Sequence, residues 1–184
     1  MRTLLSDREL TYQGTELRPG WLAEAFGVAG EAVVAWLGPC HVPTKNLVDL
    51  EDAAAGAEIH AARMLHFLAE HPGETLWAGV LRQRLLVALA ADLLQEQGAA
   101  GVRRRGDDLY VGKRKLSVSI ATTGGGSVLI HLALNVDPAG APVPTVGLGE
   151  LGCDPLRVAQ LLLERYAAEM HSVHAACGKV REVH

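Results

Sequence analysis

The chain has 184 residues, of which 49% are hydrophobic and 21% charged, and such values are ordinary for a globular protein. Its net charge of −4 at pH 7 argues against binding of nucleic acid, because that binding depends on lysine and arginine contacts to phosphates. The three cysteines are odd in number and widely spaced, so they form no disulfide framework. With neither a signal-like N-terminus nor a run of ~18 apolar residues, we expect one cytoplasmic domain over residues 1–184 that binds no membrane.

The part of the chain before residue 74 predicts short elements separated by glycine, proline and polar residues. The apolar run 32–37 lies between Gly30 and Gly38 and is typical of a strand buried on both faces. Residues 53–63 predict a weak helix, because Gly56 lowers the helix propensity of this alanine-rich segment. The other elements predicted here are strands at 3–5 and 10–12, helical turns at 21–26, a loop at 44–46 and a strand at 64–70.

Two longer helices are predicted later in the chain. Residues 74–97 repeat apolar side chains with the 3.6-residue period of a helix. Asp154 and Pro155 are typical of a helix start, as N-cap and first helical residue, and predict a helix that runs to about residue 176. The proline- and glycine-rich segment 138–150 is predicted as a long loop, a kind of segment that often carries function.

Between these helices, apolar and polar residues alternate as in strands joined by tight turns. Gly112 and Lys113 lie where a two-residue hairpin loop would join 109–111 to 114–116. A glycine-rich turn at 122–127 leads into a strand at 128–136. This turn lacks the Gly-Lys-Ser/Thr ending of a phosphate-binding loop, so we interpret it as a flexible hairpin.

The two-residue period of a strand assigns side chains to faces. It places Leu116, Val118 and Ile120 on one face of the first long strand, opposite Ser117, Ser119 and Ala121. In the second long strand, one face carries Leu129, His131, Ala133 and Asn135, and the other Val128, Ile130, Leu132 and Leu134. With the strands paired antiparallel, we expect one β-platform to gather Asp108, Lys115, His131 and Asn135. A short basic cluster beside it suits a small anionic ligand and consists of Arg103, Arg104, Arg105, Lys113, Arg114 and Lys115.

The segment from Arg105 to Ser119, RGDDLYVGKRKLSVS, followed by HLALNV at 131–136, resembles the catalytic core of biotin and lipoate protein ligases and lipoyl(octanoyl) transferases. Those enzymes carry a motif similar to R/W-x-N-D-I-x-V-x-G-x-K-I-x-G. The whole chain looks still more like the uncharacterised family named domain of unknown function three-six-six, through RRGDDLYVGKRKLSVSIAT and GLGELGCDP. The resemblance implies an α/β (α+β) fold of the biotin and lipoate ligase type, with a mixed, largely antiparallel sheet flanked by helices.

The resemblance also implies a site. Lys115 matches the ligase lysine that lies against the acyl-adenylate, where an ammonium stabilises negative charge, and Asp108 matches the aspartate that would orient it. These two are the candidate catalytic residues. The candidate ligand-binding residues are Arg105, Asp107, Ser117, His131 and Asn135. Each candidate also has a structural alternative: an exposed strand lysine, aspartates paired with neighbouring arginines, and a hydrogen-bonded core histidine.

Two departures from the ligase pattern argue against ordinary biotin or lipoate ligation. The arginine- and glycine-rich loop that embraces the carboxylate and phosphates has no counterpart, since residues 38–52 are acidic, with Lys45 as their single lysine or arginine. The Asn of the Asn-Asp pair is replaced by Asp107. The cofactor therefore stays open, with ATP, and Mg if ATP is used, as one option.

Cys153 is a separate candidate, as the nucleophile of a transferase reaction. It falls about where the transferase cysteine occurs, although the Pro-Cys-Gly context of that family is missing. A position just before a helix start would lower its pKa and make a thiolate available. The alternative is a plain buried thiol.

Two loose groups of histidine and cysteine have a spacing at which zinc is conceivable, although we expect no metal. One group is His171, His174 and Cys177 with His184, and the other is Cys40 and His41 with His60 and His66. Two functions fit these observations: binding of a small anionic or carboxylate ligand with acyl- or adenylyl-transfer chemistry, and a non-catalytic ligand-binding or assembly module that has lost the phosphate loop. Exposed sheet edges favour a homo-oligomer, a dimer or larger.

Overall fold

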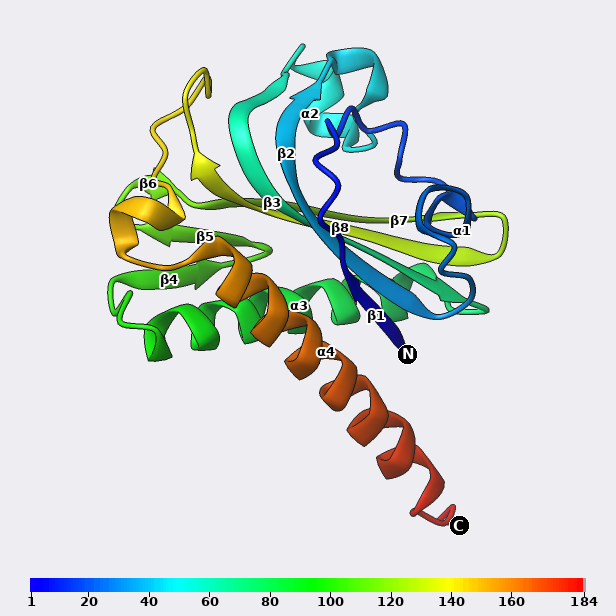
Figure 1. Ribbon diagram of the computed structural model, residues 1–184. Coiled ribbons are helices and arrows are strands. Elements are labelled where there is room, and N and C mark those ends of the chain that lie inside the picture. The colour runs from blue at the N-terminus through cyan, green and yellow to red at the C-terminus, as the bar shows by residue number, and fades with distance from the viewer. Residues whose placement is uncertain (184) are drawn as a thin grey trace.

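The computed structural model describes residues 1–183, which form a five-stranded and a three-stranded β-sheet with flanking helices (Figure 1). The strand order of the large sheet is β1-β2-β3-β8-β7, and that of the small sheet is β4-β5-β6. β1 is parallel to β2, and every other pair is antiparallel. The predicted fold class, a mixed and largely antiparallel sheet flanked by helices, is therefore confirmed. The strands are β1 (Arg2–Leu5), β2 (Ala32–Val42), β3 (Ile59–Pro72), β4 (Val102–Arg105), β5 (Asp108–Val111), β6 (Arg114–Lys115), β7 (Ser117–Gly124) and β8 (Ser127–Asp137).

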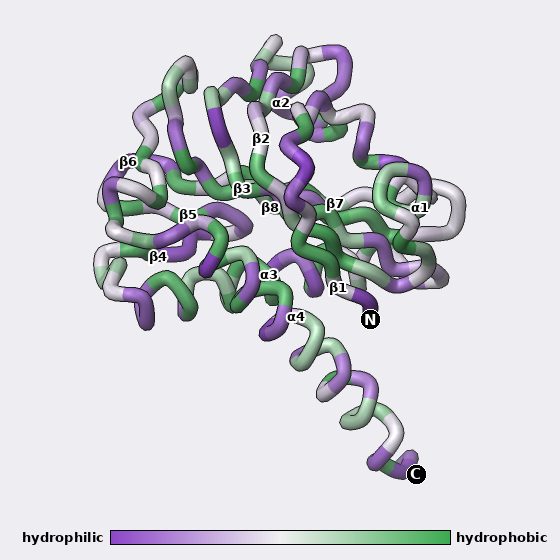
Figure 2. The backbone as a smooth tube through the Cα atoms, viewed as in Figure 1, coloured by the Kyte–Doolittle hydropathy of each residue, from purple (hydrophilic) through white to green (hydrophobic). Residues whose placement is uncertain are grey.

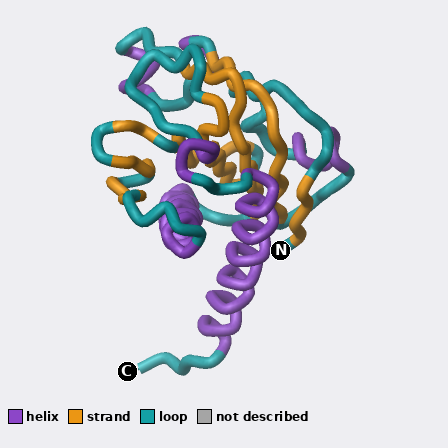
Figure 3. Tube along the Cα trace, turned by 60° about the vertical axis from the view of Figure 1, so that its left-hand side comes forward, coloured by secondary structure: helices purple, strands orange, loops and turns teal. Residues whose placement is uncertain are grey.

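The two long helices cover one face of the large sheet. α3 (Leu76–Glu96) contacts β7 and β8, and α4 (Pro155–Gly178) contacts β1 and β2. Aliphatic side chains of both helices and of the sheet form the main core beneath them. Hydrophobic residues along these elements are green on the backbone tube of Figure 2. From His171 onward the side chains of α4 are exposed, and this end of the helix extends away from the sheets (Figures 1 and 3).

The opposite face of the large sheet carries a second apolar cluster. It is covered by the segment before β2, which includes α1 (Trp21–Phe26), and the aromatic ring of Trp36 lies at its centre. The connection from β2 to β3 carries two short helices, η1 (Thr44–Asn46) and α2 (Leu50–Ala54). A last 3₁₀ turn, η2 (Leu148–Leu151), precedes α4.

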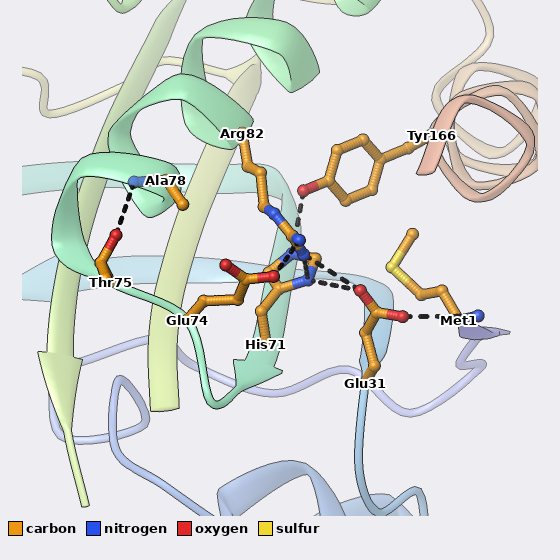
Figure 4. Close-up of polar contacts among 8 residues, drawn as sticks. All are labelled: Met1, Glu31, His71, Glu74, Thr75, Ala78, Arg82 and Tyr166. Carbon is orange, nitrogen blue, oxygen red and sulfur yellow. Dashed lines mark hydrogen bonds and ion pairs between the residues drawn. The ribbon is translucent and has the colours of Figure 1, made fainter. Parts of the chain in front are cut away.

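The helix starts follow from local hydrogen bonding. Asp154 accepts a hydrogen bond from the backbone N–H of Arg157 at 2.7 Å, and Pro155 is the first helical residue, as predicted. The Thr75 hydroxyl accepts one from the N–H of Ala78 at 3.2 Å (Figure 4). Both side chains satisfy N–H groups that a helix leaves without a partner in its first turn.

Beside the start of α3, partly buried polar groups join the start of β2 and the end of β3 to both long helices (Figure 4). The Arg82 guanidinium donates to Glu31 at 3.0 Å and to Nδ1 of His71 at 2.6 Å. Nδ1 of His71 also lies 3.1 Å from a carboxylate oxygen of Glu31, and Nε2 lies 2.9 Å from the Tyr166 hydroxyl. Burial, with the nearby Arg82 charge, lowers the pKa of His71 although Glu31 acts in the other direction.

Several sequence predictions need correction. The predicted helix 53–63 is wrong: α2 ends at Ala54, and β3 begins at Ile59, because residues 59–61 pair with the end of β2. β2 continues past Gly38 to Val42 through a bulge, and the strand expected at 10–12 is a single bridge from Tyr12 to Cys40. The hairpin at Gly112 is confirmed, with φ of 61° at that glycine, and so is the β7–β8 hairpin.

The predicted faces are correct for β8 and wrong at the start of β7. Val118 and Ile120 do pack on the face of His131, but Leu116 packs into the core on the helix side. The alternation is interrupted there because Lys115 ends the small sheet and Ser117 begins the large one.

Candidate functional site

A cavity of about 760 Å³ lies on the face of the large sheet opposite α3 and α4. Its lining comes from β7 and β8, from the small sheet, from residues 42–61 and from the loop 141–145. The size is within the range of small-molecule sites, and apolar side chains make up most of the walls. Of the residues predicted for the site, those that line it are Asp107, Asp108, Lys115, Ser117, His131 and Asn135.

Lys115 and Asp108 form an ion pair at the cavity wall. Nζ of Lys115 lies 2.7 Å from Oδ2 of Asp108, with the side chains 30% and 17% exposed. Burial raises the pKa of Asp108 more than Lys115 lowers it. Burial also acts against the ammonium of Lys115, but the hydrogen bond and charge of Asp108 outweigh it, so the pKa of Lys115 is raised. Both side chains come from the small sheet, whereas His131 belongs to the large sheet. The three residues therefore line one cavity but do not lie on one β-platform.

The backbone of Lys115 is held on two sides. Its N–H donates to the carbonyl of Pro144 at 2.9 Å, and its carbonyl accepts from the N–H of Val146 at 3.1 Å and from Nδ2 of Asn135 at 3.1 Å. The long loop predicted beside the strands therefore lies against β6, and Asn135 connects the large sheet to the small one. These hydrogen bonds fix the position of the Lys115 backbone, from which its side chain extends at the cavity wall.

The side chains of Asp107 and Ser117 form an ion pair and hydrogen bonds with other residues of the protein. Asp107 lies 3.3 Å from the guanidinium of Arg84, on α3, and accepts from Gln83 at 3.2 Å. The Ser117 hydroxyl oxygen accepts from the N–H of Leu109 at 2.8 Å. Both residues thus position the small sheet against α3 and β7.

His131 lies in a stack of rings that the sequence did not indicate. Nε2 of His131 is 3.1 Å from Nδ1 of His66, and the ring of Tyr12 stacks on His131 with 3.7 Å between centroids. Burial lowers the pKa of His66 to about 4 and that of His131 well below its ordinary value. His66 lay in a predicted strand, but its contact with His131 depends on the register of β3 against β8.

Arg105 and Cys153 are not brought to the cavity. Arg105 is exposed on β4, with its guanidinium 5.4 Å from the ring centre of Tyr110. Cys153 is 4% exposed within the core under the long helices, and burial raises the pKa of its thiol. The position before α4 therefore does not produce the lowered pKa that a nucleophilic thiolate requires.

Carboxylates outnumber cations around the cavity. Lys115 is the one lysine or arginine among the described lining residues, whereas the lining carboxylates are Asp49, Asp52, Glu58, Asp107 and Asp108. Within residues 1–183, Asp49, Asp52 and Glu58 form no ion pair, and Asp49 instead caps α2. Asp49 and Asp52 belong to residues 38–52, the segment in which the resemblance predicts an arginine- and glycine-rich loop.

In the part of the chain that the structure describes, neither of the two predicted groups of histidine and cysteine forms a metal site. Among the described residues, no three histidine, cysteine, aspartate or glutamate side chains come together as metal ligands would. His171, His174 and Cys177 are exposed near the end of α4, and His184 lies outside the described residues. In the second group, His66 bonds to His131 instead. No helix within residues 1–183 is long and apolar enough to cross a membrane.

A family model described as a domain of unknown function, DUF366, matches residues 1–181. The chain belongs to this family. The uncharacterized protein MJ0805 of Methanocaldococcus jannaschii is 33% identical over 174 residues, which cover 89% of this chain and 77% of that protein. A protein of unknown function from Pyrococcus horikoshi is 36% identical, with a TM-score of 0.95 over 100% of both chains.

Among solved structures, the DUF366 chain is also similar to ligases. A biotin protein ligase from Aquifex aeolicus, in complex with biotin and ATP, has a TM-score of 0.56 at 13% identity, covering 91% of this chain and 69% of that one. A putative lipoate protein ligase from T. acidophilum, Ta0514, with bound lipoic acid, has a TM-score of 0.55 at 12% identity, covering 92% and 85%. At such identity these likenesses show the fold alone, and the expected ligase-like fold is confirmed.

Proposed function

We propose that this DUF366 protein binds a small, largely apolar molecule that carries one carboxylate or carbonyl group, with that group next to Lys115. The observation that supports the proposal is the ammonium of Lys115, the one cation among the described residues of a mainly apolar cavity of about 760 Å³. Its ion pair with Asp108 uses one of three N–H donors, which leaves the others for a ligand oxygen.

The same ammonium suits acyl transfer. In a desolvated site it would stabilise the oxyanion that develops on a carbonyl oxygen during attack by an external nucleophile. Neither Cys153 nor Cys40 lies in the cavity lining. The acyl acceptor would therefore be a second substrate.

The residues around the cavity do not fit the triphosphate of ATP. Phosphates need several cations or helix N-termini, whereas Asp49, Asp52 and Glu58 line this part of the cavity. We therefore derive no adenylyl-transfer step for this chain. These three carboxylates also favour a second candidate function, a non-catalytic binding module on the ligase-like scaffold.

Calorimetric titration with octanoate and its methyl ester tests the binding proposal. We expect the wild type to bind octanoate 10- to 100-fold more tightly, which corresponds to ~1.5–3 kcal/mol for a hydrogen bond to a charged group. Lys115→Met should remove this preference. The matched control Lys113→Met, in the exposed turn between β5 and β6, should keep it. Equal affinity of the wild type for acid and ester would refute the proposal.

A second measurement separates catalysis from binding alone. Acyl transfer from 4-nitrophenyl octanoate to an added amine forms an amide and releases 4-nitrophenolate, which absorbs visible light. Acceleration that Lys115→Met abolishes and Lys113→Met retains supports the transfer reaction. Octanoate binding without any acceleration supports the binding module.

A further inference from the structure

The hydrogen bonds around His66 fix the position of its proton. Nε2 of His66 lies 3.2 Å from the backbone carbonyl oxygen of Gly38. A carbonyl oxygen only accepts, so Nε2 carries the hydrogen and donates it. Burial keeps the ring neutral at pH 7, so Nδ1 of His66 holds a lone pair.

This lone pair in turn fixes the proton of His131. Nε2 of His131 is 3.1 Å from Nδ1 of His66, and with an acceptor on the His66 side it must donate. His131 is also neutral and buried, so its own Nδ1 is unprotonated. The stacked ring of Tyr12 holds the plane of the His131 ring.

The unprotonated Nδ1 of His131 faces the cavity. Within residues 1–183, Oδ1 of Asp108 is the one fully buried side-chain nitrogen or oxygen without a partner. Nδ1 of His131 has no hydrogen bond in the described chain, so it keeps accessible surface. His131 is only 3% exposed and lines the cavity, so that surface lies inside it.

Asn135 supplies a second acceptor by the same reasoning. Its Nδ2 donates to the carbonyl oxygen of Lys115 at 3.1 Å, which assigns the orientation of the amide. Oδ1 of Asn135 makes no hydrogen bond within residues 1–183 and is not among the fully buried atoms, although the residue is 5% exposed and lines the cavity. The floor of the cavity, formed by His131 and Asn135 on β8, therefore offers two lone pairs.

We propose that the floor of the cavity selects ligands by an uncharged N–H or O–H group that donates to Nδ1 of His131. Oδ1 of Asn135, whose Cα lies roughly 13 Å farther along β8, would accept from a separate donor. His66 is then a positioning residue, because it holds His131 in the accepting tautomer without touching the ligand. An uncharged donor fits better than an ammonium, because both acceptors are neutral and nearly buried, at 3% and 5% exposed, and a buried charge loses hydration that a neutral acceptor does not replace. The inference deepens the proposed function, in that it uses the same cavity.

Nitrogen NMR of histidine-labelled wild-type protein tests the tautomers without any ligand. We expect both His66 and His131 to carry the proton on Nε2 at pH 7, with an unprotonated Nδ1. A proton on Nδ1 of His131, or a charged ring at pH 7, would overturn the inference.

Two lactams test the selection. δ-Valerolactam has one N–H, and its N-methyl derivative has none, so a floor that accepts hydrogen bonds should bind the first at least 10-fold more tightly. His66→Phe should reduce this ratio below 3-fold and leave His131 in a mixture of tautomers. The control His171→Phe, on the exposed end of α4, should keep the wild-type affinity ratio and the wild-type tautomer of His131. Equal affinities in the wild type, or no binding of either lactam, would overturn the inference even if His66→Phe does not fold.

The outcome is independent of the carboxylate proposal. Lactam selection without any preference for octanoate over its ester refutes the role of Lys115 and leaves the inference intact. The reverse result overturns the inference and leaves the proposed function intact.

Discussion

Nζ of Lys115 lies 2.7 Å from Oδ2 of Asp108, while Oδ1 of the same carboxylate is buried without a partner. The pair therefore differs from a surface ion pair, because one carboxylate oxygen loses water and gains nothing in exchange. Such a pair sets the charge state of the lysine more than it stabilises the fold. The first experiment follows from that difference.

Asp108→Asn should lower the pKa of Lys115. Burial acts against the ammonium, and Asp108 is the group that reverses this effect in the wild type. Titration of ¹³C-dimethylated lysines by NMR would measure the change, with the signal of the exposed Lys113 as reference. A Lys115 titration that does not move would contradict the assigned ion pair.

The free energy of unfolding should fall between pH 7 and pH 5. His66, His71 and His131 are buried, and burial lowers the pKa of each below its ordinary value. In this window the unfolded chain takes up protons that the folded chain does not, so stability that is present above pH ~6.5 is lost as the pH falls. With a folded pKa of about 4, His66 alone should account for roughly 2 kcal/mol at pH 5.

Urea unfolding at the two pH values would measure this loss. His66→Phe should show a smaller difference between pH 7 and pH 5, whereas the exposed His171→Phe should show the wild-type difference. Equal stability of the wild type at both values would mean that these rings are charged or exposed in the folded protein.

Gly38→Ala should destabilise the fold by about 3 kcal/mol. A Cβ at this position would lie 1.9 Å from the carbonyl oxygen of Leu10, a backbone atom that also accepts from the Trp36 indole. The matched control is Gly149→Ala, where nothing lies within 4 Å of the added atom and stability should hardly change. Denaturant midpoints that fall equally in both variants would contradict the close approach of residue 10 to β2.

Among the three cysteines, only Cys177 should react quickly with an aromatic disulfide reagent in the folded protein. Cys177 is exposed, whereas burial raises the pKa of Cys153 and raises that of Cys40 to about 12. One fast thiol per chain, lost in Cys177→Ala, is the expected count. Rapid labelling of Cys153 would restore it as a candidate nucleophile.

The sequence predicted a strand at 128–136 and its faces, because branched aliphatic residues recur at every second position from Val128 to Leu134. The observed β8 has the same faces and extends by one residue at each end. The sequence prediction failed at 53–63, where alanines favoured a helix while pairing with β2 decides for a strand. The conflict arises because helix propensity is local and strand pairing is not.

The site shows the same division. Lys115 and Asp108 are close in sequence and joined by one hairpin, so their proximity could be predicted. His66 reaches His131 only through the register of β3 on β8, and Tyr12 reaches it through a bridge to Cys40. Neither relationship follows from residue spacing. The predicted homo-oligomer and cytoplasmic location stay predictions.

Leu116 is the single residue between the last strand of the small sheet and the first long strand that follows. A guest molecule held by Lys115 on one side and by His131 on the other would span this junction. Occupancy should therefore restrict movement of one sheet against the other and slow hydrogen–deuterium exchange of amides across β4, β5 and β6. Ligand binding would then be detected as slower exchange in the small sheet, without a change in the overall structure.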